Sequence, residues 1–467
     1  MTVQTSPPGT VSTEKLTGFA GKLITADHPE YEAARKVYNG MIDKRPAVIA
    51  RCRGVADVVA AVRFARGEGL PIGVRGNGHS VAGHGTCDGG MLIDLRNFRS
   101  VQVDPQTRTA WVGGGATLGD VDRDTQLYGL ALPTGQVSMT GIGGLTLNGG
   151  LGMLQRKYGL TCDNLIGAQM VTPDGDVINI SETEHPDLLW ALRGGGGNFG
   201  VVTSFKFQLH QVGPMMAAGL VAYPIDQAPE VLAFLRDFIA DAPEELSADV
   251  IFQFAPPLDV IPEEYRGKQI AGIFVRWCGD PEEGMRVVRP IQEFGNPVLN
   301  FVAPMPLVTV QSLLDSLNPD GNLHYWTGEF LPRFDEREID VVTEIGATLP
   351  SRFSIVQVIP FNGAPTRVPP DATAFAHRDD SWLIHVLCQW EEPEDTERCR
   401  AWAKDAGAKL RSIGSGDAYL NLLTDDEETD RIKAFWNDSR LSRLREVKTK
   451  YDPENVFRFN HNIKPDE

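Results

Sequence analysis

Val74-Arg-Gly-Asn-Gly-His-Ser80 opens the first of four glycine clusters in this chain of 467 residues. The other clusters occupy residues 113–115, 141–152 and 194–200. Glycine lets the backbone approach a ligand closely and adopt positive φ, so the four together indicate a large ligand lying along main chain. Any one cluster alone would be read as tight turns in a strand-rich domain. Because His79 and Asn148 lie within two of them, a cofactor bed is favoured.

One cluster matches the dinucleotide fingerprint G-x-G-x-x-G through Gly195, Gly197 and Gly200. That fingerprint requires a strand before it and a helix after it. Here residues 186–193, with Pro186 in the first turn, predict a helix before the glycines, and residues 201–209 predict a strand after them. The order is reversed, which argues against a nicotinamide-binding Rossmann site.

Hydrophobic patterning predicts further elements along the chain. Residues 46–75 have the pattern of a β-α-β unit, short strands are expected at 90–95, 100–104 and 109–113, and a helix is expected at 118–128. Beyond Pro214, long alternating runs such as 381–390 are typical of half-buried antiparallel strands. Near the C-terminus, Ile432, Phe435, Trp436, Leu444 and Val447 predict an amphipathic helix.

The length predicts two or three domains. The simplest partition is a glycine-rich cofactor domain formed by residues 16–211 and 416–467, with a substrate domain, residues 212–415, inserted between its two parts. Residues 1–15 lack the apolar run of a signal peptide and are expected to be a flexible tail.

Composition narrows the classes of partner. The formal net charge is −18 and there is no run of Lys or Arg, so nucleic acid is not expected. The most apolar stretch, residues 212–223, is too short to span a bilayer, so no membrane is expected. Six scattered cysteines without a C-x-x-C pair argue against a disulfide framework and a zinc site, and favour a reducing, cytoplasmic location.

Six ordered segments carry a family resemblance. They are residues 74–80, 141–152, 157–164, 197–203, 373–378 and 451–462. Together they resemble the berberine-bridge-enzyme-like FAD-linked oxidases, in the superfamily of vanillyl alcohol oxidase and p-cresol methylhydroxylase, and above all a bacterial branch that oxidises hydroxynicotine. The resemblance implies an α+β fold: a two-lobed FAD-binding domain of the vanillyl-alcohol-oxidase type with an inserted antiparallel-sheet substrate domain.

The resemblance implies FAD bonded covalently through one histidine. In this family the histidine of the R-G-x-G-H loop bonds the flavin 8α-methyl carbon, and it corresponds to His79. A neutral imidazole is nucleophilic enough for this bond; the alternative is a loop histidine that makes only hydrogen bonds. The place of the cysteine that forms a second bond in many relatives is Val137 here, so a single bond is expected.

Other positions are assigned to FAD by the same resemblance. Backbone donors at residues 75–80 and 138–144 would hold the diphosphate, Val202 would meet the adenosine half, and Asn460 and Asn462 would meet the ring system. Gly135 corresponds to a position where a small side chain leaves room for dioxygen. The full set of cofactor residues is His79, Arg75, Gly76, Asn77, Gly78, Ser80, Gly135, Val137, Ser138, Thr140, Gly141, Gly144, Asn148, Gly152, Val202, Asn460 and Asn462.

The catalytic base is left open. Many relatives use the second tyrosine of a Tyr-x-Asn-Tyr segment, which reads Tyr419-Leu-Asn-Leu422 here, and residues 353–360 lack the Lys and Glu of the hydroxynicotine-oxidising branch. Tyr419, Gln357 and Asn164 are the catalytic candidates, with Asn164 expected near the isoalloxazine edge. Four residues also lie near the expected site but have core or surface alternatives: His324, Tyr325, Trp326 and Glu329.

The function expected from this resemblance is an FAD-dependent oxidase that transfers hydride from a small alcohol, sugar or amine to flavin N5 and reduces O2 to H2O2. Alternatives are a dehydrogenase with another electron acceptor and a flavin-bearing protein that binds a small molecule without turnover. No metal is expected, because His84 has no carboxylate or cysteine partner in its loop. A monomer or a homodimer would fit equally well.

Overall fold

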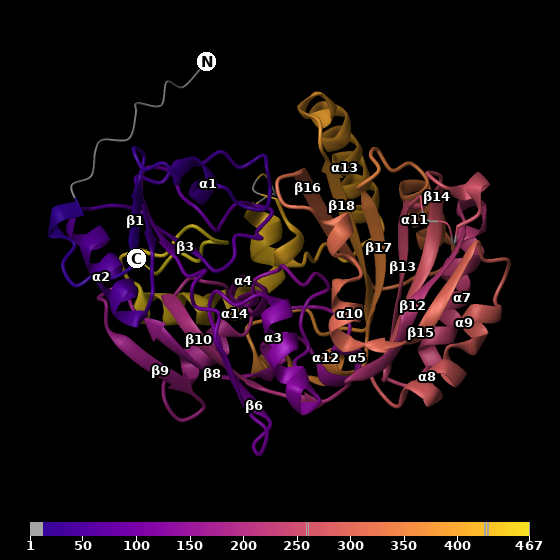
Figure 1. Cartoon of the computed structure of the whole chain (residues 1–467), viewed down its shortest axis with the longest axis horizontal. Coiled ribbons are helices and arrows are strands. Elements are labelled where there is room, and N and C mark those ends of the chain that lie inside the picture. The colour runs from indigo at the N-terminus through magenta and orange to yellow at the C-terminus, as the bar shows by residue number, and fades with distance from the viewer. Residues whose placement is uncertain (1–12, 258, 260, 425, 427–428, 467) are drawn as a thin grey trace.

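The computed structural model describes residues 13–257, 259, 261–424, 426 and 429–466. The predicted tail over residues 1–15 lies outside these ranges except at its end, where η1 (Thr13–Lys15) forms a 3-10 turn. Figure 1 shows the N-terminal elements, in indigo and magenta, in one half of the molecule and the pink and orange elements in the other. The C-terminal segment, in yellow, returns to the N-terminal half.

A four-stranded sheet of order β1-β2-β4-β3 lies nearest the N-terminus. Its strands are β1 (Lys22–Thr25), β2 (Val48–Arg51), β3 (Ile72–Arg75) and β4 (Met91–Asp94), and its helices are α1 (Tyr31–Arg35) and α2 (Val55–Gly67). Val58, Ala61, Val62 and Ala65 bury one face of α2 against this sheet, as the periodicity predicted. The β-α-β unit over residues 46–75 is present, with β4 inserted in parallel between its two strands.

A five-stranded antiparallel sheet of order β5-β6-β10-β8-β9 follows in the same half. Its strands are β5 (Val101–Asp104), β6 (Thr109–Gly113), β8 (Leu165–Val171), β9 (Val177–Ser181) and β10 (Val201–Gln208). The accompanying elements are α3 (Leu118–Thr125), η2 (Gln126–Tyr128), α4 (Ile142–Leu147), α5 (Gln155–Tyr158), η3 (Cys162–Asn164), α6 (Pro186–Leu192) and the two-stranded ribbon of β7 (Leu130–Ala131) and β11 (His210–Gln211). Helix α6 thus precedes the glycines of residues 194–200 and β10 follows them, which confirms the reversed order.

A seven-stranded antiparallel sheet of order β15-β12-β14-β13-β17-β18-β16 forms the other half. Its strands are β12 (Met215–Pro224), β13 (Leu246–Phe254), β14 (Gln269–Trp277), β15 (Leu299–Pro306), β16 (Leu323–Leu331), β17 (Ile355–Phe361) and β18 (Ser381–Trp390). Together with the sheets of the other half, it confirms the α+β class. The boundaries proposed for the two domains stay a prediction.

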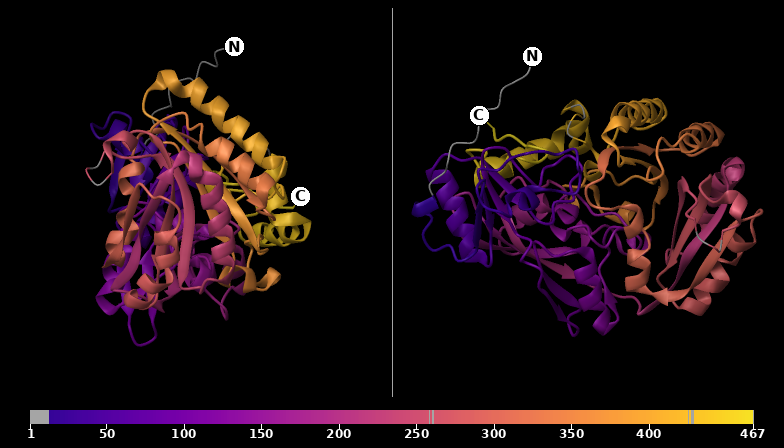
Figure 2. Two further views of the ribbon diagram at one scale, coloured as in Figure 1. Left: turned by 90° about the vertical axis from the view of Figure 1, so that its right-hand side faces the viewer. Right: turned by 45° about the horizontal axis from the view of Figure 1, so that its top comes forward.

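Helices cover the outer face of this sheet, as Figure 2 shows when the molecule is seen from that side. The helices of this half are α7 (Ala228–Asp241), α8 (Pro281–Val287), α9 (Arg289–Glu293), α10 (Leu307–Ser312), α11 (Glu336–Gly346), α12 (Ala364–Arg367) and α13 (Thr396–Arg411). Its 3-10 turns are η4 (Ile225–Gln227), η5 (Glu263–Tyr265), η6 (Asp315–Leu317), η7 (Pro370–Ala372) and η8 (Pro393–Asp395). Apolar residues of α7, α11 and α13 share one core with the sheet.

The prediction that residues 381–390 form a half-buried strand was wrong in one respect. Strand β18 has the predicted extent, but Trp382 is its only residue that is not buried. One face packs under the helices, and the opposite face, which carries Leu383, His385 and Leu387, lines an internal cavity. Both faces are therefore shielded from solvent.

The C-terminal region contains η9 (Leu420–Leu422) and α14 (Thr429–Tyr451). The predicted amphipathic helix is interrupted, since Asn437 has non-helical angles (φ 51°, ψ 169°) and divides α14 into two parts. Among the residues described, no helix is long and apolar enough to cross a membrane.

Candidate flavin and substrate cavity

A cavity of about 310 Å³ lies between the two halves of the molecule. One wall consists of the glycine clusters and the C-terminal segment, and the other consists of strands of the seven-stranded sheet. Most predicted site residues line it. They are Gly76, Asn77, Gly78, His79, Ser80, Gly135, Val137, Thr140, Gly141, Gly144, Asn148, Val202, Gln357, Tyr419 and Asn460.

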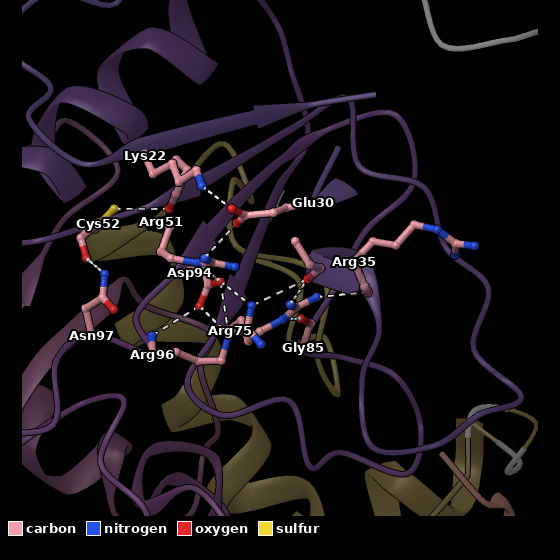
Figure 3. Close-up of polar contacts among 12 residues, drawn as sticks. Lys22, Glu30, Arg35, Arg51, Cys52, Arg75, Gly85, Asp94, Arg96 and Asn97 are labelled. Carbon is pink, nitrogen blue, oxygen red and sulfur yellow. Dashed lines mark hydrogen bonds and ion pairs between the residues drawn. The ribbon is translucent and has the colours of Figure 1, made fainter. Parts of the chain in front are cut away.

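Arg75 does not line the cavity; its side chain braces the neighbouring loop, as Figure 3 shows. The buried guanidinium donates to the carbonyl oxygens of Ala34 (2.6 Å), Arg35 (3.1 Å) and Gly85 (3.1 Å). Burial lowers the pKa of Arg75 to about 10, still far above neutral pH. Burial would raise the pKa of Asp94, but the Arg96 and Arg75 guanidinium groups hold it below its usual value. Arg75 therefore ties the backbone of residues 34–35 to Gly85, which itself lines the cavity.

Asn164 also lies away from the cavity lining. Its amide nitrogen donates to the carbonyl oxygens of Tyr158 and Leu160, each at 2.9 Å, and its Oδ1 lies 2.6 Å from His210 Nε2. All these contacts close the turn before β8. The structure gives Asn164 a role in local folding. It does not place Asn164 in the cavity lining with Gln357 and Tyr419.

Three further predicted residues do not line the cavity. The amide and hydroxyl of Ser138 donate to Asp315 at 2.9 and 2.5 Å, which ties the glycine-rich wall to η6. A Cβ on Gly152 would lie 1.8 Å from the Thr134 carbonyl oxygen, so glycine is needed there for packing. Asn462 is exposed, whereas its neighbour His461 lines the cavity.

His79 is half-buried at one end of an aromatic stack on the cavity wall. Its ring stacks on Tyr38, with centroids 3.8 Å apart and planes 14° apart, and Tyr38 stacks in turn on His324 at 4.3 Å. Burial lowers the pKa of His79 to about 4, so the imidazole is neutral at physiological pH. Its Nε2 is buried and has no hydrogen-bond partner among the described residues. A neutral ring with one unpaired nitrogen therefore belongs to the lining of the candidate site.

Tyr419 lines the cavity with its hydroxyl held from two sides. The hydroxyl oxygen accepts hydrogen bonds from the Gly150 amide at 2.8 Å and from Asn421 Nδ2 at 3.0 Å. Burial raises the pKa of Tyr419 to about 12. Both acceptor sites are thus occupied and the phenol stays protonated, so the group left free is its O–H donor.

Gln357 belongs to a chain of polar contacts on the opposite wall. Its Nε2 donates to Asp249 Oδ2 at 2.6 Å and to Gln136 Oε1 at 2.7 Å. Asp249 also pairs with Arg276, and both side chains are only 2% exposed. Burial of Arg276 lowers its pKa to about 9, which still leaves the guanidinium charged at neutral pH.

The four residues that had core or surface alternatives occupy different places in the structure. Trp326 lines the cavity. His324 is buried against Tyr38, and Tyr325 lies on the opposite face of β16, near Arg400 and Lys404. Glu329 is buried and bonds the Gly416 amide at 2.7 Å and Arg431 at 2.7 Å.

Gln136, His385 and Asn421 also line the cavity and were missed as candidates. The sequence position of each could have identified it. Gln136 lies between two predicted residues, His385 is two residues from Leu383 and Leu387 on a predicted strand, and Asn421 lies within the segment that contains Tyr419. His84 also lines the cavity and meets His461 edge to face at 4.7 Å. No group of three or more His, Cys, Asp or Glu within the described part of the chain could hold a metal ion.

Known proteins match this chain over nearly its whole length. The family model described as an FAD binding domain matches residues 46–181, and the model described as berberine and berberine like matches residues 418–464. The (R)-6-hydroxynicotine oxidase of Paenarthrobacter nicotinovorans is 33% identical over 460 residues, which are 96% of this chain and 97% of that protein. The chain belongs to the berberine-bridge-enzyme-like family of FAD-linked oxidoreductases. The resemblance seen in the sequence is thereby confirmed.

A second relative of this flavoprotein is the chitooligosaccharide oxidase of Gibberella zeae, 29% identical over 453 residues, which cover 92% of this chain and 89% of that one. Among solved structures, 6-hydroxy-D-nicotine oxidase from Arthrobacter nicotinovorans superposes with a TM-score of 0.87 at 30% identity, covering 98% of this chain and 100% of that chain. These matches confirm the vanillyl-alcohol-oxidase type of fold. The chain is an FAD-linked oxidoreductase.

The cavity residues fit FAD. A Cβ on Gly144 would meet no atom within 4 Å, and one on Gly141 would lie 2.7 Å from Asn77 Cβ. A side chain at the first position would occupy the cavity, and one at the second would displace the loop that carries His79. The unpaired Nε2 of His79 is a buried polar atom in this lining that has no partner among the described residues.

Proposed function

We propose that this chain is an oxidase whose FAD is attached covalently through His79 alone, and that it oxidises a small alcohol, sugar or amine with O2 as the electron acceptor. The observation that carries the proposal is the neutral imidazole of His79, a residue of the cavity lining, whose buried Nε2 has no hydrogen-bond partner among the described residues. Val137, at the place where relatives carry a second linking residue, has no nucleophilic atom.

FAD when bound accepts two electrons and a hydrogen from substrate at N5 and passes them to O2 as H2O2. For an alcohol the balance is R2CHOH + O2 → R2CO + H2O2. The protein must hold the substrate C–H against the ring and accommodate the hydroxyl proton.

The described lining of this cavity offers no strong base to accept the substrate proton. The Tyr419 phenol has a pKa raised to about 12 by burial and accepts two hydrogen bonds, so it acts as a donor that orients an oxygen or nitrogen. Among the described residues that line the cavity there is no Asp, Glu, Lys or Arg. We infer that the proton leaves the substrate late, after most of the C–H bond has broken, since no strong base is in place to remove it first.

Gly135 supports the choice of O2 as acceptor. A Cβ there would lie 3.1 Å from Leu118 Cδ1 and 3.3 Å from Leu145 Cδ1, so a larger residue would fill this part of the wall. Gly135→Val is expected to slow reoxidation of the reduced protein by O2 while leaving its anaerobic reduction unchanged.

Acid precipitation of the purified holoprotein tests the attachment. Yellow colour should stay with the pellet of the wild type and move to the supernatant for His79→Ala, whereas His84→Ala, in the same loop, should keep it in the pellet. Wild-type colour found wholly in the supernatant would refute the covalent bond. Peroxide formation with a panel of alcohols, sugars and cyclic amines tests the oxidase reaction, and slow reoxidation in air would point to a dehydrogenase.

A further inference from the structure

Two neighbouring strands, β17 and β18, contribute six side chains to the wall of the cavity that faces the glycine clusters. Cross-strand pairing puts Ile355 beside Leu387, Gln357 beside His385, and Ile359 beside Leu383. All six side chains line the cavity, and we call them the sheet wall. Because side chains alternate between the two faces of a strand, the wall presents one polar pair flanked on both sides by aliphatic pairs.

Neighbouring side chains fix which way the side-chain amide of Gln357 is oriented. A carboxylate can only accept hydrogen bonds, so the amide nitrogen of Gln357 must face Asp249, and its second N–H reaches Gln136. The ion pair of Asp249 with Arg276 holds this arrangement from behind. Gln357 Oε1 therefore remains as an acceptor for a ligand, and Gln136, whose oxygen is engaged, remains as a donor.

His385 completes the polar pair. Its Nε2 is buried and has no hydrogen-bond partner among the described residues, and its side chain is 6% exposed. Burial lowers its pKa to about 3, so the ring is neutral. A neutral imidazole offers one donor and one acceptor, but no charge.

No fixed charge within the described lining could balance a charged ligand, and Asp249 and Arg276 neutralise each other. Moving an ion from water into such a cavity carries a desolvation penalty that no opposite charge offsets, and a buried hydroxyl without a partner loses its hydrogen bonds to water. Both penalties disfavour ligands that are ionised or bear hydroxyl groups on every side.

We infer that the substrate is an uncharged molecule with a single hydroxyl or neutral N–H at the reacting carbon, donated to Gln357 Oε1, and that its remaining contacts with the sheet wall are made by apolar carbon. The inference rests on the oxidation proposed above and narrows its substrate class. Ionised amines and carboxylates are disfavoured, and so are oligosaccharides, because hydroxyls that face Ile355, Leu387, Ile359 and Leu383 would have no partners on the sheet wall.

A matched set of probes tests this class on the oxidised holoprotein. Benzyl alcohol, benzylammonium, benzoate and cellobiose are titrated while the flavin absorption spectrum is recorded. Benzyl alcohol should perturb or bleach the flavin with a dissociation constant at least about tenfold lower than those of the other three. Equal or tighter binding of either ion or of the disaccharide, or no binding of benzyl alcohol, would overturn the inference.

Variants locate the contact. Gln357→Leu should weaken benzyl alcohol about tenfold while leaving toluene, which lacks the hydroxyl, unchanged. Gln253→Leu is the matched control, because Gln253 is a buried glutamine of the same sheet that does not line the cavity. Equal weakening of both probes by Gln357→Leu would assign the effect to packing and contradict the contact. The wild-type titrations decide the class even if this variant fails to fold.

The peroxide assay and the titrations together distinguish failure of the proposed oxidase function from failure of the inferred substrate class. Purified protein that binds no flavin, or flavin-bearing protein that forms no peroxide from any substrate, would refute the proposed oxidase. A flavin-bearing oxidase that prefers charged or polyhydroxylated probes would refute only the substrate class.

Discussion

Tyr38 packs between the loop that carries His79 and strand β16 of the seven-stranded sheet. Its ring lies between those of His79 and His324, and its hydroxyl is 3.3 Å from Asn318 Oδ1. The next residue, Asn39, donates to the carbonyl oxygens of Val81 at 2.8 Å and of His324 at 3.2 Å. The orientation of the His79 imidazole is therefore set by packing against a residue that is distant in sequence.

Removing this ring should slow covalent attachment. Stacked aromatic contacts contribute about 0.5–1.5 kcal/mol, so Tyr38→Ala is expected to lower the rate at which apoprotein converts added FAD to acid-stable flavin by roughly twofold to tenfold. Tyr38→Phe, which keeps the ring, should attach flavin at close to the wild-type rate. Tyr128→Ala, at a tyrosine 48% exposed, is the control. Equal slowing by Phe and Ala would assign the effect to the hydroxyl and contradict a role for stacking.

Helix α3 combines a well-satisfied N-terminus with an unsatisfied acid. Thr117 and Asp120 form a capping box, and Arg99 pairs with Asp120 at 2.7 Å. Asp122, two residues further along the helix, is 2% exposed, and its Oδ2 has no hydrogen-bond partner in the described structure. Burial raises the pKa of Asp122 to about 8, so folding favours the protonated acid.

This shift makes a pH-dependent prediction. An acid with an unfolded pKa of about 3.9 and a raised folded pKa contributes no penalty below pH 4, and its ionisation progressively destabilises the fold as pH rises towards 8. Asp122→Asn keeps the shape without the ionisable group and should raise the free energy of unfolding by about 2 kcal/mol or more at pH 8. Unfolding midpoints of both proteins at pH 5 and pH 8 measure it, with Asp124→Asn as control. A difference of the same size at both pH values would contradict this account.

The strands and helices predicted from periodicity occupy nearly their expected residues, because the buried face of α2 and the alternation of β10 and β18 are local properties. The predictions that were wrong concerned features that depend on the segments packed against an element. Burial of both faces of β18 and the break of α14 at Asn437 are set by packing partners that the local sequence does not name. The same limit applies to the site: His79 is recognisable from its loop, whereas the contact of Gln357 with Asp249 and Gln136 joins residues more than 100 positions apart.

At the scale of the whole molecule, the C-terminal segment closes the flavin-binding half. Lys448 Nζ lies 2.6 Å from Asp452 and donates to the carbonyl oxygens of Asn198 at 2.7 Å and Phe457 at 3.0 Å. Both charged side chains are completely buried. The contacts join α14 to the glycine cluster of residues 194–200 and hold the segment that carries Asn460 and His461 against the cavity.

Breaking this pair should loosen the whole cofactor half. Removal of one partner of a buried ion pair costs about 3–5 kcal/mol, so Lys448→Met is expected to lower the unfolding midpoint strongly and to lower the fraction of purified protein that carries FAD. Lys450→Met is the matched control, since Lys450 is exposed and pairs with Asp187 at the surface, where the cost is about 1 kcal/mol or less. Similar midpoints for the two variants would show that the buried pair does not hold the C-terminal segment in place.

The central claim, a flavin bonded to His79, is tested most directly by mass spectrometry of trypsin-digested holoprotein. The peptide that follows Arg75 runs to Arg96 and contains both His79 and His84. We predict that it carries the mass of FAD less two hydrogens, and that fragmentation places this mass on His79. An unmodified peptide from yellow protein, or a modification on His84, would contradict the account.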